Sequence, residues 1–561
     1  MLFAINYTRI RLILSLFIGL TTVQSCTRID EWQGDDDAVS ATIATSVTQL
    51  PLIAAEDDRV ILEIKLQVDD LQRCAVNIIK ISLKGTSDLN DLETIGIFYA
   101  GSDKSSTSTA QFGRTVRPAS EIIFEDHWVL KEKTAYFKVL AKIKKNVDLL
   151  HLIDASCEMV RINDTEVIPE TKSPGGALKM GMVIRKHGGD QVHTYRIPGL
   201  TTTAKGTLLA VYDVRRESDR DLQGNMDIGL SRSTDGGNTW EPMRIILDKG
   251  KWGGLPEKFN GISDACILVD KNTNTIFVAG LWMYGVLNSS GQWVENLSEN
   301  SGNWNHQWWN RGSQAGFDVK QTSQFLLTKS TDDGQTWSEP VNLTRMCKKE
   351  SWWLWAPAPG HGITLDDGTL VFPTQGRDEG GVYFSNITWS RDGGQTWKTS
   401  NLAGRNSNEN MVVQLADGSV MLNARDCKNA ANSSNTNGRM IAVTKDLGET
   451  WSEYPVSEPL IEPFCMASIH KHDYTENGEK KSILLFSNPN SKIKRDHITI
   501  KVSFDEGKTW PEKYWTLLDE GVGRGYSCLT SVDEQTIGII YEGSQADLMF
   551  QKIALSELIN K

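Results

Sequence analysis

The residues of this chain that could do chemistry are carboxylates, arginines and tyrosines rather than cysteines or histidines. The eight cysteines are scattered over 561 residues, and no two have the C-x-x-C spacing of a thiol redox or zinc site. The nine histidines include no H-E-x-x-H motif, and His470 and His472 lie beside polar residues that predict a surface loop. Cysteine-based metal chemistry and redox catalysis therefore have no support in the sequence.

The charge balance excludes one class of partner and points to another. The chain has 59 Lys and Arg against 71 Asp and Glu, a formal net charge of −12, whereas nucleic-acid binding needs a clustered basic face. Charges more than about 8 Å away are screened at physiological salt, so a few convergent arginines would still bind an anion. A guanidinium grips a carboxylate through two parallel N–H bonds, so the positions of the arginines decide what is bound.

The elements that must position such side chains are indicated by an eight-residue box that occurs five times. Each copy follows an alternating apolar run such as Ile498–Val502, which predicts a hairpin turn at the end of a strand. In that turn the Asp can accept backbone N–H groups, the Gly can supply a positive φ and the Trp can cover the apolar side. The pattern S/T-x-D-x-G-x-T-W ends at Trp240, Trp337, Trp397, Trp451 and Trp510.

The spacing of the boxes predicts a β-propeller. Most successive boxes are 54 to 60 residues apart, which is the length of one four-stranded blade, and the stretch from Gly181 onward then makes about six blades around a channel. One interval of 97 residues carries an insertion. This interval contains Trp282, Trp293, Trp304, Trp308 and Trp309. These side chains could line an aglycone or glycerol subsite, or they could pack within the insertion.

The first 49 residues are expected to export the protein. Arg9 and Arg11 precede an apolar stretch that is too short for a spanning helix, so residues 1–25 predict a signal peptide. Small residues before Cys26 resemble a loose bacterial lipoprotein site, which would attach the protein to a membrane by a lipid anchor at Cys26; an ordinary cleavage nearby is the alternative. Residues 26–49 predict a tether, and we expect the periplasm, outer membrane or cell surface of a Gram-negative bacterium.

Residues 50–175 predict a small β-sandwich that is separate from the propeller at 176–561. This stretch has no box and ends at a Pro-Gly-Gly linker, and Cys74 and Cys157 within it could form a disulfide bond. Glycan binding and a packing or spacer role both stay open for this domain. Its alternating apolar runs are Val60–Val68, Cys74–Leu83, Thr94–Ala100 and Thr134–Ile143.

A resemblance to a known family starts at His193–Pro198, which reads HTYRIP. This motif followed by five boxes resembles the bacterial exo-α-sialidases (neuraminidases) of glycoside hydrolase family 33, and the resemblance extends from Gly181 to Glu542. It implies an enzyme that releases terminal α-linked sialic acid from sialylated glycans on glycoproteins, glycolipids and oligosaccharides. It implies no metal and no cofactor.

By this resemblance, three arginines grip the carboxylate of sialic acid: Arg196, Arg425 and Arg495. Arg439 is a weaker competitor for a place in the site. Each of the three would end or flank a strand in a different blade, so that distant positions converge at the mouth of the channel.

The resemblance also implies two roles within the charged segment Tyr212–Leu222. Arg215 would contact the substrate and Asp221, six residues later, would be the acid/base; Arg216 and Asp219 are the nearby rivals. Asp264 resembles the family's aspartate near the amide and glycerol side of the sugar, although the usual Asp-Pro is Asp-Ala here.

Finally, the resemblance makes Tyr526 the nucleophile, Glu409 its base and Glu542 the group that orients Arg196. The anomeric carbon already bears a carboxylate, so a neutral phenol avoids the repulsion that an anionic nucleophile would meet. Its pKa near 10 makes it a weak nucleophile unless a base removes the proton, and net retention should follow. Trans-sialidase or intramolecular trans-sialidase activity, and a non-catalytic sialic-acid-binding propeller, stay open as alternatives.

Overall fold

Alternating apolar residues become antiparallel strands almost throughout the computed structural model of this chain. It describes residues 39–54, 58–72, 74–103, 110–222, 224–252, 257–284 and 313–561. The expected signal peptide, Cys26 and Trp293, Trp304, Trp308 and Trp309 lie outside these ranges. Within them the chain is all-β, α1 (Thr344–Cys347) and α2 (Leu555–Ile559) are single turns, and no helix is long and apolar enough to cross a membrane.

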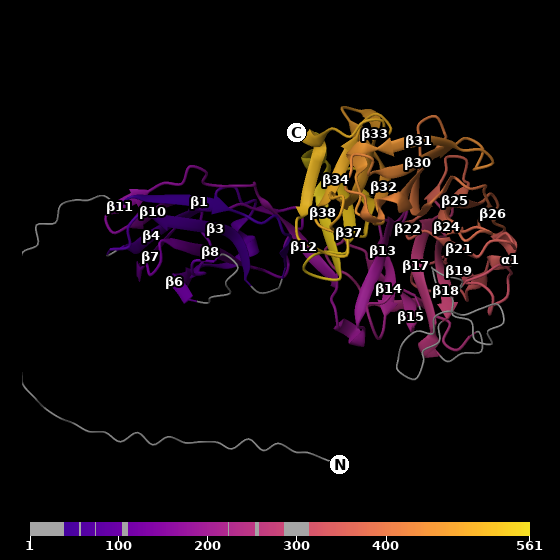
Figure 1. Cartoon of the computed structure of the whole chain (residues 1–561), viewed down its shortest axis with the longest axis horizontal. Coiled ribbons are helices and arrows are strands. Elements are labelled where there is room, and N and C mark those ends of the chain that lie inside the picture. The colour runs from indigo at the N-terminus through magenta and orange to yellow at the C-terminus, as the bar shows by residue number, and fades with distance from the viewer. Residues whose placement is uncertain are drawn as a thin grey trace, which may run out of the picture.

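Two sheets form the N-terminal part, drawn in indigo and purple in Figure 1. Their strand orders are β1-β3-β8-β5-β6 and β11-β10-β4-β7, and side chains of both sheets share one apolar core. In β8 every second residue is buried, which is the period of a strand with one face on a core. The first sheet contains β1 (Ala41–Ser46), β3 (Arg59–Val68), β5 (Leu92–Tyr99), β6 (Ala110–Val116) and β8 (Thr134–Ile143). The second contains β4 (Ala75–Ser82), β7 (Glu121–Val129), β10 (Ser156–Ile162) and β11 (Thr165–Val167).

Two expectations for this part are wrong. The segment 26–49 is not a tether throughout, because β1 lies inside it and pairs along its length with β3. Cys74 and Cys157 are both buried, and neither is in a disulfide bond. Burial raises the pKa of both thiols, that of Cys157 to about 12, so they serve as small apolar side chains of the core.

The rest of the chain folds into antiparallel meanders that follow one another along the sequence. The last three strands share a sheet with β12, so the beginning and the end of this region lie side by side (Figure 1). That sheet contains β12 (Leu178–Arg185), β36 (Ser527–Asp533), β37 (Thr536–Tyr541) and β38 (Leu548–Ala554). The next strands are β13 (Thr194–Thr202), β14 (Leu208–Arg215), β15 (Met226–Ser233), β16 (Arg244–Leu247), β17 (Asn260–Val269), β18 (Ile276–Tyr284), β19 (Gln324–Ser330) and β20 (Val341–Asn342).

Three further meanders complete this region. The first strand of the third meander from β13 is broken into β21 (Leu354–Pro357), β22 (Gly360–His361) and β23 (Ile363–Thr364), which precede β24 (Leu370–Arg377), β25 (Tyr383–Ser390), β26 (Lys398–Thr399) and β27 (Gly404–Arg405). The fourth contains β28 (Ser407–Gln414), β29 (Val420–Asp426), β30 (Arg439–Thr444) and β31 (Ser452–Ser457). The fifth contains β32 (Ser468–Glu476), β33 (Glu479–Pro489), β34 (Ile498–Ser503) and β35 (Trp515–Asp519).

One strand of each meander lies beside a strand of the next. β13 is next to β17, β17 to β24, β24 to β28, β28 to β32, β32 to β36, and β36 to β13. Among these strands β17 and β24 are buried from end to end, β13 and β28 are mostly buried, and β32 and β36 are buried in their first residues. The edges of these strands therefore meet around a common centre.

The five boxes form the hairpin turns that their sequence predicts, between the third and fourth strands of their meanders. In every copy the first Ser or Thr donates to the Asp and accepts from the box Gly N–H, while the later Thr donates both its N–H and its hydroxyl to the same Asp. The box Gly has φ between 81° and 88° in all five, a region that favours glycine. The Trp side chains are buried or half-buried, so the box is a structural element.

Candidate active site

The side chains expected to do chemistry meet at one edge of the meanders. Arg196 is near the start of β13, Glu409 near the start of β28 and Tyr526 directly before β36. Arg425 is near the end of β29, and Glu542 directly follows β37. Because neighbouring strands are antiparallel, the start of one strand and the end of the next lie at the same edge.

Tyr526 and Glu409 form the centre of this site. The Tyr526 hydroxyl donates to Glu409 Oε1. Arg425 Nη1 donates to Glu409 Oε2 at 2.5 Å and to Tyr526 Oη at 3.0 Å. Tyr526 is only 5% exposed, and burial together with the Glu409 charge raises its pKa well above the ordinary value. The phenol is therefore neutral at rest and has a carboxylate in position to take its proton.

Glu542 holds Arg196 and the backbone around Tyr526 together. Arg196 Nε and Nη2 donate to its two oxygens at 2.6 and 3.1 Å, and the N–H groups of Ile197 and Tyr526 donate at 2.9 and 3.1 Å. Burial alone would raise the pKa of Glu542, but Arg196 and these donors hold it below the ordinary value. An ionised Glu542 thus fixes the first arginine against the segment that carries the tyrosine.

Three guanidinium groups surround the Tyr526 ring. Those of Arg196 and Arg495 lie 5.3 and 5.6 Å from its centroid, and Arg425 reaches its hydroxyl. Arg495 donates only to backbone oxygens, those of Arg524 at 3.0 Å and Phe464 at 3.1 Å. Three positive charges thus face two carboxylates, Glu409 and Glu542, so the site can accept an anion.

Asp221 lies at the exposed rim of the site. Its side chain is 72% exposed, and Arg215 Nη1 donates to its Oδ1 at 2.8 Å while Arg196 Nη1 is 3.8 Å away. Partial loss of water in the site opposes ionisation of this exposed side chain, but the charges of Arg215 and Arg196 outweigh it and lower the pKa of Asp221. Asp221 is therefore ionised in the ligand-free protein.

A buried aspartate that the sequence did not indicate links Arg215 to Asp264. Asp213 Oδ2 accepts from Nε and Nη2 of Arg215 at 3.2 and 3.0 Å and from the Ser263 hydroxyl at 2.6 Å. Its Oδ1 accepts from the N–H of Asp264 at 3.2 Å, and burial raises its pKa to about 6. Asp213 and Arg215 are two residues apart on β14, so they share a face of the strand, which is the signal that could have found it.

Asp264 is buried beside Asp213. It is buried with φ at 58°, and Gln375 Nε2 donates to its Oδ2 at 3.2 Å. Burial, together with the charge of Glu409, raises its pKa well above the ordinary value. The raised pKa favours the protonated carboxyl, which can donate a hydrogen bond to a ligand.

The rivals are engaged elsewhere. Arg216 pairs with Asp227 at 2.5 Å, and Asp219 pairs with Arg524 at 3.2 Å. Arg439 is fully buried and pairs with Glu462. The structure thus brings together Arg196, Arg215, Asp221, Asp264, Glu409, Arg425, Arg495, Tyr526 and Glu542. The side chains of the three rivals have other partners, although the backbone oxygen of Asp219 accepts from Arg215 Nη1 at 2.8 Å.

The surface loop expected around His470 and His472 is wrong. Both lie in β32, where Ser531 Oγ is 2.9 Å from His470 Nε2 and 2.7 Å from His472 Nδ1. The neighbouring His361 is buried, and its ring lies edge-on to that of His470 with centroids 5.5 Å apart. Burial lowers the pKa of all three, that of His361 to about 4, so the imidazoles are neutral at pH 7.

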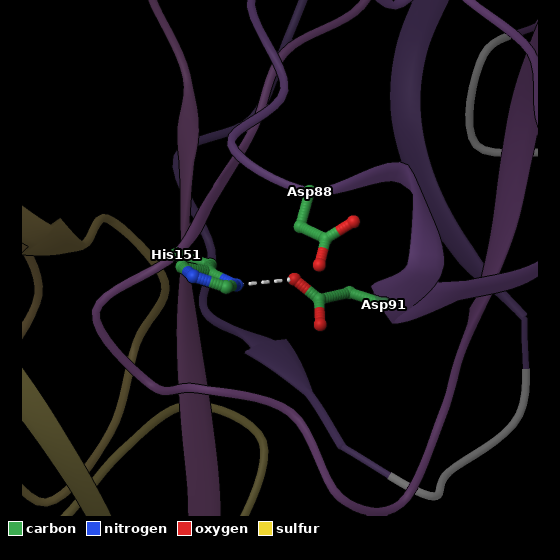
Figure 2. Close-up of side chains that lie close together, drawn as sticks. All are labelled: Asp88, Asp91 and His151. Carbon is green, nitrogen blue, oxygen red and sulfur yellow. Dashed lines mark hydrogen bonds and ion pairs between the residues drawn. The ribbon is translucent and has the colours of Figure 1, made fainter.

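One group of potential metal ligands occurs in the part of the chain that the structure describes, and it lies in turns of the N-terminal part. Figure 2 shows Asp88, Asp91 and His151, with His151 Nδ1 2.7 Å from Asp91 Oδ2. Asp88 Oδ1 accepts the N–H of Asn90 at 2.8 Å. The group includes none of the residues around Tyr526 and has no part in the candidate site.

Comparison with known proteins gives consistent matches over both parts of the chain. Residues 206–539 match the model of a BNR repeat-like domain, and residues 40–166 match that of the N-terminal domain of BNR-repeat neuraminidase. A sialidase of Bacteroides fragilis is 37% identical over 546 residues, 92% of this chain and 95% of that protein. A sialidase of Micromonospora viridifaciens is 31% identical over 382 residues, 66% of this chain and 53% of that protein.

Solved structures give the same result. The Hadza microbial sialidase Hz136 matches with a TM-score of 0.80 and 34% identity, over 92% of this chain and 100% of that one. The intramolecular trans-sialidase from Ruminococcus gnavus matches with a TM-score of 0.52 and 18% identity, over 67% of this chain and 98% of that one, which is a likeness of fold alone.

Proposed function

This chain belongs to the bacterial sialidases, with the two domains of a BNR-repeat neuraminidase, and we propose that it cleaves its substrate with retention through a covalent bond to Tyr526. Its activity is that of an exo-α-sialidase, a glycoside hydrolase that removes terminal sialic acid from sialylated substrates. The observation that carries the proposal is the bonding of Tyr526 to Glu409 and Arg425, with two further arginines against its ring.

In the first step, Tyr526 Oη forms a bond to the anomeric carbon while the bond from that carbon to the aglycone oxygen breaks. The phenol proton passes to Glu409, and Asp221 gives a proton to the departing oxygen. In the second step, water attacks the same carbon, its proton goes to Asp221, and Tyr526 leaves and regains its proton from Glu409. The tyrosine and the water attack opposite faces of the anomeric carbon, and each displacement inverts the centre, so the product retains the configuration of the substrate.

The acid role of Asp221 depends on the substrate. In the ligand-free site the neighbouring arginines lower its pKa. A sialic acid carboxylate bound by Arg196, Arg425 and Arg495 brings a negative charge close to Asp221, and a nearby like charge raises the pKa of a carboxyl. Substrate binding should therefore supply the protonated acid that the first step needs.

The decisive experiment is NMR of the products formed from α2,3- and α2,6-linked sialyllactose. If free sialic acid is released initially as the α-anomer, the result supports retaining hydrolysis. An α-sialoside of added lactose or an anhydro sugar would instead identify trans-sialidase or intramolecular trans-sialidase activity. Binding without any product would leave only the non-catalytic lectin.

We also propose that the region from Leu178 to the end is a six-bladed β-propeller. Support comes from the meander sheets, from the order β13, β17, β24, β28, β32, β36 and back to β13, and from the sheet that β12 shares with the last three strands. Joining the first and last strands in one sheet closes such a ring. The five boxes fall one to a meander in five of the six sets of strands.

For its location we propose export and attachment to the envelope of a Gram-negative bacterium by a lipid on Cys26. The support is the sequence of residues 1–26 alone. One acyl chain binds a membrane only weakly, so stable attachment needs the several chains of a bacterial lipoprotein. Mass spectrometry of the mature N-terminus tests this proposal, and an unmodified N-terminus beyond Cys26 would refute it.

A further inference from the structure

Segments of the N-terminal part are built into the sheet that carries the nucleophile. β2 (Leu52–Ile53) pairs in parallel with β12, and β9 (Leu152–Ile153) pairs with it antiparallel. Leu52 and Ile53 are buried, and Ile53 packs in an apolar cluster with side chains of β33 to β38. The N-terminal part is therefore in fixed contact with this sheet, rather than joined to it only by a linker.

From this contact, residues 49–54 and Arg59 reach two loops at the edge of the active site. The backbone oxygen of Gln49 accepts the N–H of Glu520 at 2.9 Å. Gln545 Nε2 donates to the backbone oxygen of Pro51 at 2.8 Å, and Arg59 Nη1 donates to Gln545 Oε1 at 2.7 Å. Both polar ends of the Gln545 side chain are thus held by the N-terminal part.

The two loops, residues 519–525 and 542–547, are bonded to each other and packed together, and we treat them as one unit. Ser544 donates its N–H and its hydroxyl to the two oxygens of Asp519 at 2.9 and 2.8 Å. The loops also approach each other closely at two glycines. A Cβ on Gly521 would lie 2.5 Å from the Ser544 side chain, and a Cβ on Gly523 would lie 2.5 Å from the backbone oxygen of Glu542. Displacing one loop therefore displaces the other.

The inner end of this unit is the catalytic centre. Tyr526 follows the first loop, and Glu542 begins the second. The Glu542 N–H donates to the backbone oxygen of Tyr526 at 2.9 Å, and the Gly523 N–H donates to the backbone oxygen of Arg495 at 2.9 Å. The nucleophile, the group that orients Arg196 and the backbone of Arg495 thus all belong to, or are bonded to, the same pair of loops.

On its other side the unit borders an open cavity of about 500 Å³. Packing does not fill this side of the loops, so hydrogen bonds hold them there, among them the bonds of Gln545 to Pro51 and Arg59 and that of the Tyr195 N–H to Asp547 at 2.9 Å. The cavity is lined by Lys186 and His187 and by residues 522–524 and 542–547.

We propose that residues 49–54 and Arg59 are a positioning element of the active site, which holds Tyr526 and Glu542 in register through Gln545. The proposal rests on the assignment of Tyr526 as nucleophile. It gives the N-terminal part a role in catalysis that needs no glycan binding. A small misplacement of a nucleophile slows the chemical step more than it weakens binding, because near-attack geometry is demanding.

The test compares Gln545→Ala, Arg59→Ala and the double variant with an interface control. Asp148→Ala is the control, because Asp148 pairs with Lys552 of β38 at 3.5 Å and so joins the same two parts at the far end of that strand. We expect Gln545→Ala to lower kcat and the rate of labelling by a fluorinated sialosyl fluoride by about 3- to 30-fold, with KM nearly unchanged. The control should change the melting temperature without changing kcat.

Arg59 acts through Gln545, so the double variant should lose no more kcat than Gln545→Ala alone. Equal kcat in the parent and in Gln545→Ala, with a lower melting temperature, would overturn the proposal and leave a purely structural contact. Additive losses would also overturn it. If the label in the parent enzyme maps to a residue other than Tyr526, the proposed mechanism fails instead, whatever the variants do.

Discussion

The box turns and the arginine site use charged side chains in opposite ways. In each box the Asp bonds to residues two to four positions away, and the same set of bonds recurs five times. In the site, Arg425 and Tyr526 are 101 residues apart, and Arg196 and Glu542 are 346 apart. A box is thus complete within eight residues, whereas the centre of the site around Tyr526 needs strands from several sheets.

The boxes and the active site also differ in how far water reaches their carboxylates. The box carboxylates of Asp332, Asp392 and Asp446 are bonded to Thr hydroxyl and N–H groups that lower the pKa of each to about 2, yet they stay in contact with water. Glu542 is 1% exposed, so its charge depends on Arg196 and on backbone donors. Losing one partner at an exposed turn costs little, whereas losing one in the buried site leaves an unpaired charge.

The largest effect should come from Tyr526→Phe, which removes one oxygen from the centre of the site. We expect kcat to fall by about 10³-fold or more, because the nucleophile is lost while the arginines stay in place. A fluorinated sialosyl fluoride should label Tyr526 in the parent enzyme and no residue in the variant, as measured by mass spectrometry of peptides. Normal turnover of Tyr526→Phe with the same anomer released would contradict the assignment.

Next in size should be Glu409→Gln, which keeps the shape of the base and removes its charge. General-base assistance contributes about 10²- to 10⁴-fold, so kcat and the rate of labelling should fall within that range. Arg425 loses its carboxylate partner in this variant, so circular dichroism must first show that the fold is retained. Labelling at the parent rate would remove Glu409 from the role of base.

A smaller effect should follow from Arg495→Ala, the cleanest of the three arginine variants because Arg495 donates only to backbone oxygens. Charge-assisted hydrogen bonds are worth about 1.5–3 kcal/mol, so we expect sialic acid or its unsaturated planar analogue to bind about tenfold to a few hundredfold more weakly. Calorimetry measures the change. Unchanged affinity would exclude Arg495 from carboxylate binding.

A buried histidine and the exposed box aspartates should give two separate declines in stability as pH falls. Burial lowers the pKa of His361 to about 4, below that of an unfolded histidine near 6.5, so this stabilisation is present above pH 6.5 and is lost as pH falls through about 4. The box aspartates stabilise above about pH 4 and lose this as pH falls through about 2. Melting temperatures measured from pH 8 to pH 2 test this, and His361→Gln should weaken only the first decline.

The smallest effect should come from Asp392→Ala in the third box. Losing the acceptor of the Thr396 N–H and hydroxyl should lower the melting temperature by about a few degrees and leave the kcat of the folded protein unchanged. Calorimetry and a standard turnover assay check both. A stable variant without turnover would show that the box has a role beyond structure.

The N-terminal strands and the boxes could be predicted because their information is local. The run Thr134–Ile143 became β8 with the same bounds, and each box turn formed the bonds that its Asp, Gly and Thr imply. The active-site residues could be found only because short motifs around Arg196, Glu409 and Tyr526 resemble those of a known family. Taken alone, Tyr526 indicates a core residue and Glu542 a surface residue.

Thus the sequence by itself determined the all-β class, the turns and the identities of the groups that do chemistry. Only the tertiary structure decided how these groups act on one another: that Asp213 links Arg215 to Asp264, that His472 is buried in a strand, and that Gln545 is bonded to Pro51 and Arg59. Hydrogen bonds within a turn follow from residues next to each other in the chain. Burial, and the pKa shifts that it causes, depend on which distant strands pack together, and no short stretch of sequence contains that information.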